Sequence, residues 1–298
     1  MRQSKASLFA ILFALLFPLA FSAEAFHVVV LKSAEIKPYH DALEGFRSTC
    51  NCDVSELTRD DGQSIPAAIS RMRPDAVVAI GLDAVRQVES VRDIPVFFTM
   101  VPYSASRGQG QRAMSGVYMS VPFGKQLDAI LSIFPNVKRV GLVYAAGDLH
   151  FSLTEALAAA GSKGLKLIAK QAGKPGQALA LIDEMKQGID VFLMLPDRAV
   201  VSSEMVNGLL LFSFQNRVPV FSFSKKYVEM GAIAALTVDP FDLGAQTGEV
   251  MKKTLRGDTG EHAVFPARKS VLIINRKVAK KLGVKIPDEI LEKAEIIE

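Results

Sequence analysis

Short apolar runs alternate with amphipathic segments along almost the whole chain after residue 25, and this alternation limits the fold more than any other feature. The runs are four to six residues long and rich in β-branched or aromatic side chains: residues 26–31, 75–80, 95–98, 139–144, 165–168, 190–194 and 218–221. Unalternated apolar strands are typical of parallel sheets that helices cover on both faces. We therefore expect an α/β protein with right-handed crossovers.

The strand–helix pattern occurs twice, which predicts two Rossmann-like lobes, each with a parallel sheet. The first set occupies residues 26–118, a break falls near residues 120–122, and the pattern restarts at residue 137. Within the second set, residues 122–134 show a helical period of apolar side chains after Pro122. Further strands are expected at 232–238 and 270–275, with a helix at 241–256 between them and a helical tail at the end.

The first 25 residues have the pattern of an export signal. Arg2 and Lys5 precede an apolar stretch at residues 8–17, and Ala23 and Ala25 supply small residues for cleavage before Phe26. The uncharged stretch also reaches about 18 residues, the lower limit for a membrane-spanning helix, so an uncleaved anchor is the alternative. We expect a protein that is periplasmic or secreted after cleavage.

Composition and charge exclude several classes of protein. With 49% apolar and 22% charged residues among 298, the chain is neither a disordered polymer nor a multispanning membrane protein. Removal of residues 1–25 leaves 33 basic and 30 acidic side chains, a net charge of +3. Because the charges are interspersed, nothing points to a nucleic-acid partner.

The two cysteines, Cys50 and Cys52, lie on either side of a single residue. An exported protein meets an oxidising compartment, so they form either a local disulfide or two inert thiols. Metal binding would need further ligands, and the four histidines lack the spacing of a metal site. No metal or cofactor is predicted.

Motifs of catalysis are absent from the sequence. There is no G-x-x-x-x-G-K-[ST] loop, no G-x-G-x-x-G after the first strand and no G-x-S-x-G elbow. The carboxylate pairs Asp60 with Asp61 and Asp239 with Asp242 are interpreted as a turn and a helix cap. We therefore expect no catalytic residues and no enzyme activity.

Polar and aromatic side chains follow the predicted strands, where open α/β sheets bind ligands. The candidate ligand-binding residues are Ser33, Gly81, Leu82, Thr99, Tyr103, Tyr118, Tyr144, Asp197, Arg198 and Asp239. If the lobes face each other through their strand ends, these residues line one cleft. Tyrosines, hydroxyls and a carboxylate suit a small zwitterion, although each residue also suits a half-exposed strand end for structural reasons alone.

Several segments together resemble one protein family. They are residues 95–99, 138–144, 195–197, 218–221, 231–239, 242–248, 271–275, 279–283 and 286–287. In their order and spacing they are similar to the ABC-transporter substrate-binding proteins of the tryptophan/tyrosine-binding type. The match covers nearly the whole chain after the export signal.

The resemblance implies a periplasmic-binding-protein-like I fold, in which two lobes joined by three crossings close on a ligand. It places Ser33, Thr99, Tyr144, Asp197 and Asp239 near the cleft. The chain departs from the family at Ala145, where Asn is common, at Tyr103-Ser104, where Asp-Pro is common, and at Arg198, which replaces a smaller polar residue. These departures bear on the ligand more than on the fold.

These observations predict a solute-binding protein of an ABC uptake transporter. We expect lobe 1 at 26–120 plus 240–266 and lobe 2 at 121–239 plus 267–298, with hinges near 119–121, 238–240 and 265–268. The expected ligand is an aromatic or branched amino acid, and the expected partner is an ABC permease in the inner membrane, the protein itself being a monomer. The alternative is a periplasmic sensory subunit that docks on a membrane receptor or kinase.

Overall fold

The computed structural model describes residues 25–58, 64–102, 114–145, 152–174, 176–197, 201–260 and 262–298. All of the predicted export signal except its last residue lies outside this range. Within the described residues, no helix has both the length and the apolar character needed to cross a membrane.

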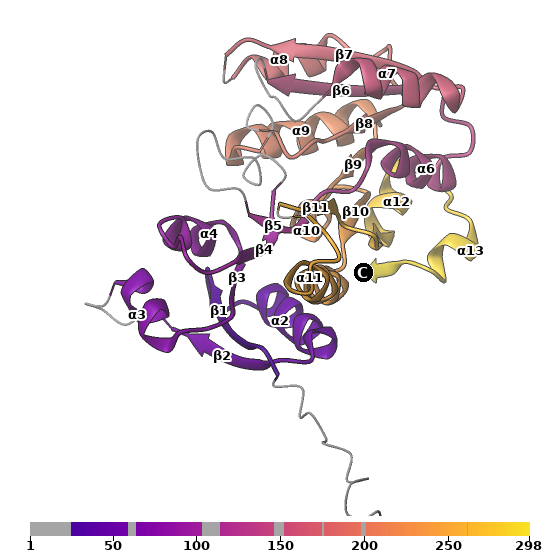
Figure 1. Ribbon diagram of the computed structural model, residues 1–298. Helices are drawn as coiled ribbons and strands as arrows, with labels where there is room; N and C mark the ends of the chain where they lie inside the picture. The colour runs from indigo at the N-terminus through magenta and orange to yellow at the C-terminus, as the bar shows by residue number, and fades with distance from the viewer. Residues whose placement is uncertain are drawn as a thin grey trace, which may run out of the picture.

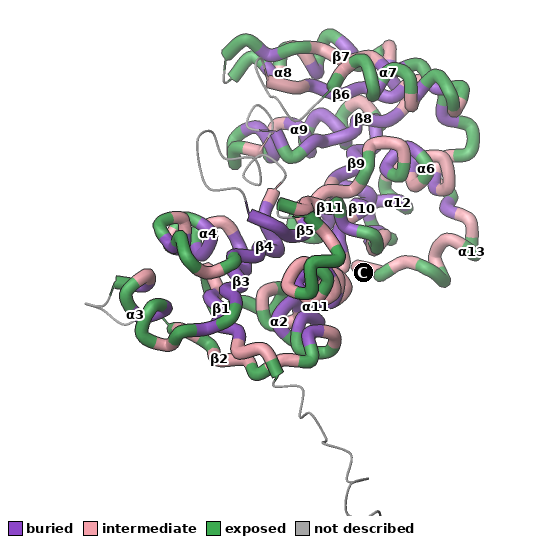
Figure 2. Tube along the Cα trace, viewed as in Figure 1, coloured by how far each residue is buried: buried purple, intermediate pink, exposed green. Residues whose placement is uncertain are grey.

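A parallel sheet of six strands forms the centre of lobe 1 (Figure 1). In spatial order its strands are β11 (Val264–Pro266), β5 (Ser115–Tyr118), β4 (Val96–Val101), β3 (Ala76–Ile80), β1 (His27–Lys32) and β2 (Asp53–Leu57). Helices α2 (Lys37–Cys50) and α11 (Pro240–Leu255) cover one face, and α3 (Ile65–Met72) and α4 (Leu82–Val88) cover the other. The inner strands β3 and β4 are buried along their whole length (Figure 2).

A second sheet of seven strands forms the centre of lobe 2. In spatial order its strands are β13 (Glu295–Ile297), β12 (Ser270–Asn275), β10 (Ala234–Val238), β9 (Val220–Ser222), β8 (Val191–Leu193), β6 (Arg139–Ala145) and β7 (Lys166–Ala172). Only the pairing of β10 with β12 is antiparallel among the described strand pairs.

The helices of lobe 2 pack on its sheet through three hydrophobic clusters. One cluster holds residues of α6 (Phe123–Ile133), α7 (Leu153–Ser162), α12 (Arg276–Leu282) and α13 (Asp288–Leu291). The second cluster holds residues of α8 (Gln177–Asp183) and α9 (Ser203–Asn216), and the third is built around Val228 of α10 (Lys225–Met230). The predicted two-lobe α/β fold is thus confirmed.

The predicted helical tail is wrong at its end. Helices α12 and α13 are followed by the short strand β13, which pairs with β12 in parallel. Ile296 packs against one cluster of the lobe 2 core, and its neighbour Ile297 packs against another. Neighbouring side chains that point to opposite sides are typical of a strand.

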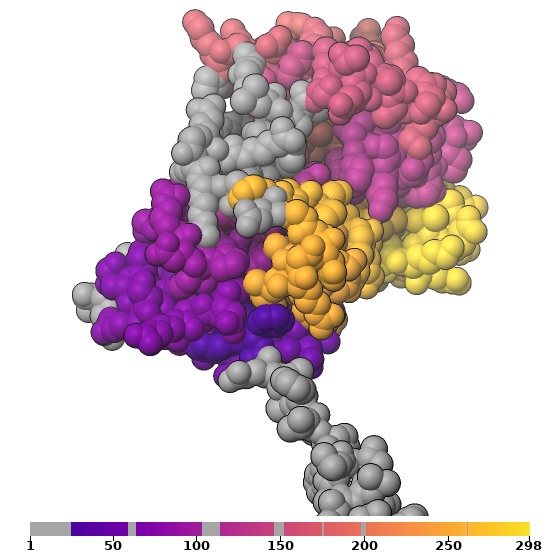
Figure 3. Space-filling view, viewed as in Figure 1, coloured from indigo at the N-terminus to yellow at the C-terminus, as the bar shows by residue number. Residues whose placement is uncertain are grey.

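The chain passes between the lobes three times. The first crossing, residues 119–122, leads from β5 to α6; the second, Asp239, leads from β10 to α11; and the third, residues 267–269, leads from β11 to β12. Lobe 1 is therefore discontinuous in sequence. Figure 3 shows the segment that contains α11, in orange, lying against the indigo and violet surface of the N-terminal part of lobe 1.

Glycines let α2 and α11 touch backbone to backbone. A Cβ atom on Gly244 would lie 1.8 Å from the carbonyl oxygen of Ala42, and one on Gly45 would lie 1.8 Å from that of Phe241. At the same contact, the Thr49 hydroxyl donates a hydrogen bond of 2.7 Å to the carbonyl oxygen of Ala245. Any larger residue would force the helices apart, which explains the glycines of residues 242–248 physically.

We predict that Gly244→Ala destabilises the protein by about 1–3 kcal/mol, because the added methyl group overpacks a contact made with backbone. Urea unfolding measures the loss. The control is Gly161→Ala in α7, where a Cβ atom meets nothing within 4 Å and alanine is the better helix former. Equal stability of the Gly244→Ala variant and the wild type would contradict this packing.

A carboxylate fastens the start of β6 in lobe 2. Asp190 accepts hydrogen bonds from the backbone N–H groups of Lys138 and Arg139 and from the Arg139 guanidinium, the shortest at 2.6 Å. Burial acts to raise the pKa of Asp190, but these hydrogen bonds and the guanidinium charge outweigh it and hold the pKa below its ordinary value. The pair therefore stabilises the fold above the unfolded-state pKa, and this stability is lost as the pH falls through the folded-state pKa.

We predict that Asp190→Asn lowers the free energy of unfolding at pH 7 and that its deficit shrinks as the pH falls below about 4. Urea unfolding at pH 7, 5, 4 and 3 measures both effects. Asp93→Asn, at an exposed position in a turn, serves as the control. A deficit that stays constant over this pH range would show that the carboxylate charge is not the cause.

Candidate functional site

Three of the candidate residues meet at the carboxyl edge of the lobe 1 sheet. The backbone N–H of Ser33 donates to the carbonyl of Ile80, and the N–H of Gly81 donates to the carbonyl of Thr99, both at 2.9 Å. Ser33 and Gly81 thus follow the neighbouring strands β1 and β3, and Thr99 lies inside the next strand, β4, two residues before its end. The structure brings this part of the predicted site together.

The hydroxyl of Ser33, which follows β1, caps α4, the helix that follows β3. Gly81 is the N-cap residue of α4 and has no side chain to accept a hydrogen bond, and the Ser33 Oγ instead accepts from the N–H of Ala84 at 2.8 Å. Gly81 has a φ of +91°, and a Cβ there would lie 2.6 Å from the Ser33 Oγ and 2.7 Å from the Tyr39 hydroxyl. Glycine is therefore required at position 81 for both backbone and space.

Tyr39 belongs to this edge and was missed by the sequence analysis. Its hydroxyl lies beside Gly81 and its side chain is half-buried. Burial, followed by the nearby charge of Asp83, raises the pKa of Tyr39, so the phenol keeps its proton at neutral pH. Tyr39 stands in the first turn of the helix after β1, and an aromatic residue at that position is the signal that could have revealed it.

Thr99 is fully buried, and its hydroxyl has no hydrogen-bond partner among the described residues. The next residue, Met100, has a φ of +55°, and the register between β4 and β5 shifts at this point. Such bulges re-aim side chains and are frequent next to functional sites. Leu82 and Tyr118, the other described candidates of lobe 1, are half-buried and pack against the apolar cluster beneath α3 and α4.

Two candidates of lobe 2 also lie together, at the ends of the paired strands β6 and β8. Asp197 is 2% exposed, and its Oδ2 accepts a hydrogen bond of 2.7 Å from the N–H of Ala145. The neighbouring Tyr144 is half-buried and packs against a cluster of the lobe 2 core. Ala145, where the family often has Asn, thus contributes its backbone rather than its side chain.

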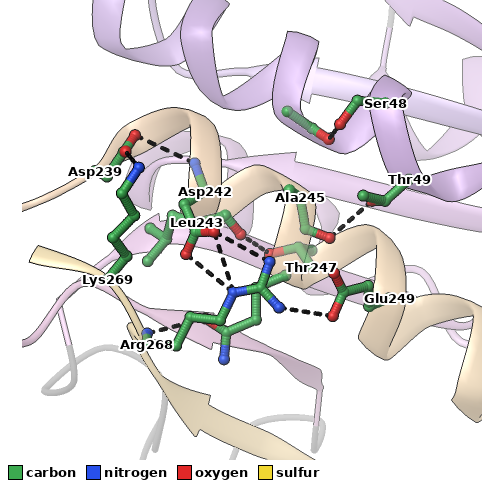
Figure 4. Close-up of polar contacts among 12 residues, drawn as sticks. Ser48, Thr49, Asp239, Asp242, Leu243, Ala245, Thr247, Glu249, Arg268 and Lys269 are labelled. Carbon is green, nitrogen blue, oxygen red and sulfur yellow. Dashed lines mark hydrogen bonds and ion pairs between the residues drawn. The ribbon is translucent and has the colours of Figure 1, made fainter.

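Asp239 lies at the second crossing and is already engaged (Figure 4). It is the N-cap of α11, where it accepts a hydrogen bond from the N–H of Asp242, and its Oδ2 lies 2.7 Å from the Lys269 ammonium. Burial acts to raise the pKa of Asp239, but the hydrogen bonds and the Lys269 charge outweigh it and lower the pKa. The cap expected from the sequence is present.

The remaining candidates, Tyr103 and Arg198, lie outside the described residues. A groove of about 400 Å³ between α12 and α13 and a second of about 170 Å³ beside α11 contain none of the candidate residues. The described candidate residues of lobe 1 lie near the strand ends of its sheet, those of lobe 2 near the ends of β6 and β8, and Asp239 lies at a crossing between the lobes.

The cysteines are joined, so the choice between a disulfide and two thiols is settled in this structure. Cys50 and Cys52 form a disulfide at the end of α2, with Asn51 between them in the left-handed region at a φ of 52°. Within the described residues, no three His, Cys, Asp or Glu side chains gather as metal ligands would.

Comparison with protein families decides the class of the chain. The family described as ABC transporter substrate binding protein matches residues 51–297. The chain belongs to this family. The resemblance found in the sequence is therefore confirmed. The family is one of solute-binding proteins, which implies a small-molecule ligand and an ABC permease partner.

Solved structures share the fold over most of this chain and nearly all of theirs. A conserved domain protein from Vibrio cholerae O1 biovar El Tor is 28% identical, with a TM-score of 0.59 and coverage of 92% of this chain and 100% of the other. The ligand-free, open structure of a substrate-binding protein with adhesive properties from Clostridium difficile is 21% identical, with a TM-score of 0.71 and coverage of 92% and 99%.

A third solved structure contains a ligand. An ABC domain from Streptococcus pneumonia in complex with L-Trp is 21% identical, with a TM-score of 0.57 and coverage of 91% and 100%. Among the curated proteins, none matches the chain.

We predict that Ser33→Ala lowers the free energy of unfolding by about 1 kcal/mol, because the N–H of Ala84 loses its acceptor at the start of α4. Chemical denaturation measures this loss. Ser162→Ala is the control, since that exposed hydroxyl donates only to a carbonyl of its own helix. An unchanged free energy for Ser33→Ala would show that the hydroxyl does not act as a cap.

Proposed function

We propose that this protein binds an aromatic or branched amino acid between its two lobes and delivers it to an ABC permease. Membership of the substrate-binding family carries the proposal. The L-Trp in the related complex supports an amino-acid ligand. On this proposal the protein is not an enzyme, acts as a monomer, and works in the periplasm or outside the cell after its export signal is removed.

The proposed binding surface combines the strand-end groups of both lobes. Lobe 1 comprises residues 26–120 and 240–266, and lobe 2 comprises residues 121–239 and 267–298. The hydroxyl of Thr99 and backbone N–H groups near Gly81 would bind the ligand carboxylate, while Tyr144 and Asp197 would contact its side chain and ammonium group. The carboxylate of Asp239 is paired with Lys269, so an ammonium group could bind it only by competing with that lysine.

Closure of the lobes would couple binding to delivery. Contacts made with both lobes at once exist only in the closed form, so a ligand shifts the open–closed population by its difference in affinity for the two forms. The same closing cleft would also suit a sensory subunit. The neighbouring genes separate the two roles, because permease and ATPase genes indicate uptake.

Isothermal titration calorimetry of residues 26–298 with a panel of amino acids tests the proposal. We expect one-site binding of at least one of L-Trp, L-Tyr, L-Phe, L-Leu, L-Ile and L-Val, and a rise in melting temperature with the same compound. Tyr144→Ala and Asp197→Asn should each weaken binding about tenfold or more, an effect typical of a central contact residue.

The control variant is Leu157→Ala, at a 48% exposed position on α7, which should bind as the wild type does. If no small metabolite produces either binding heat or a shift in melting temperature, the proposed transport function is overturned. Binding that Tyr144→Ala, Asp197→Asn and Leu157→Ala all leave unchanged would overturn the proposed site.

A further inference from the structure

In the second and third crossings, a single residue links the elements and anchored residues of one lobe to those of the other. In the second, Val238 is the last residue of β10 and Pro240 is the first of α11, so only Asp239 lies between these two elements. The Val238 backbone pairs with Ser270, the first residue of β12, while its side chain is buried in the lobe 1 core. The strands β10 and β12 therefore end and begin side by side.

The third crossing is anchored on lobe 1 up to Arg268. Ala267 is buried in the lobe 1 core. The backbone N–H of Arg268 donates to the Gln246 side chain, and its guanidinium donates to both oxygens of Asp242 and, at 2.8 Å, to Glu249. These three partners all belong to α11, and Figure 4 shows the contacts of Arg268 with Asp242 and Glu249. Because Ser270 already belongs to the lobe 2 sheet, only Lys269 is left to bend.

The two linking residues, Asp239 and Lys269, pair with each other. The Lys269 ammonium lies 2.7 Å from the Asp239 carboxylate, and the two side chains are 61% and 18% exposed. We propose that Asp239 and Lys269 are the pivot about which the lobes turn, and that their ion pair favours the arrangement of the lobes seen in this structure. This inference rests on the proposed lobe closure, and it makes Lys269 a positioning residue for that motion rather than a ligand-binding one.

The surroundings of the pivot agree with a bend confined to these two positions. Rotation of the lobes requires the backbone angles of Asp239 and Lys269 to change together, and an ion pair between their side chains resists that change. The first crossing has four residues, 119–122, and so imposes less restraint. Lys125 of α6 donates a hydrogen bond of 3.2 Å to the carbonyl oxygen of Arg268, so a side chain of lobe 2 contacts the residue that attaches the third crossing to lobe 1.

The test measures the distance between the lobes by electron spin resonance in the absence of ligand. Spin labels on Ser90→Cys in lobe 1 and Ser162→Cys in lobe 2 report this distance. They are the only free thiols, because the two native cysteines are joined. We expect Lys269→Met, which keeps the side-chain stem but removes the charge, to increase the population of a second interlobe distance at least twofold.

Lys269→Arg should restore the wild-type distances. In 1 M NaCl, the distance distribution of the wild type should shift towards that of Lys269→Met, whereas the distribution of Lys269→Met should stay unchanged. Lys225→Met is the matched control, since Lys225 pairs with Glu295 at 2.5 Å within lobe 2 and away from the crossings. Arg268→Ala, which frees the third crossing from α11, should broaden the distribution.

Identical distance distributions for wild type, Lys269→Met and Arg268→Ala would overturn the pivot. An effect of Lys225→Met as large as that of Lys269→Met would overturn it too. None of these measurements needs a ligand, so failure of the proposed amino-acid binding would be a separate result.

Discussion

The backbone contact between α2 and α11 is the interaction on which the two-lobe architecture depends. Lobe 1 is assembled from two stretches of chain, and α11 returns to it only after the chain has built most of lobe 2. The contact holds because Gly45 and Gly244 let each helix touch the carbonyl groups of the other. Without so close an approach, the end of α11 and strand β11 would have no fixed place beside β5.

The same atoms hold the fold and line the candidate site. Ser33 follows β1 at the strand-end edge and its hydroxyl caps α4, and Asp239 lies at the second crossing and its carboxylate caps α11. These two polar side chains are therefore already hydrogen-bonded within the protein. The hydroxyl of Thr99 is an exception among the described residues of this edge, because it is buried and has no partner.

The sequence was sufficient for the fold where the signal was local. Strands β1 and β3 were predictable because they are apolar on both faces, as inner strands of a parallel sheet must be. The edge strand β2 and the last strand β13 were missed, because their burial is partial and their apolar runs are short. The grouping of Ser33 with Gly81 and Thr99 followed from the rule that parallel strands end at one edge.

Partners distant in sequence were not predictable in this way. The pairing of Lys269 with Asp239, and the anchoring of Arg268 on α11, depend on how residues about 20 to 30 positions apart meet in space, which no periodicity records. Tyr39 was missed for a similar reason, since its hydroxyl reaches Gly81 across the start of a helix.

The bond between the backbone of Ala145 and Asp197 has a consequence for how such proteins diverge. Because the donor is a main-chain N–H, the buried carboxylate stays in place whichever side chain position 145 carries, proline excepted. A change at position 145 therefore leaves this hydrogen bond in place, and its cost depends on how the new side chain packs against the lobe 2 hydrophobic cluster that Ala145 contacts.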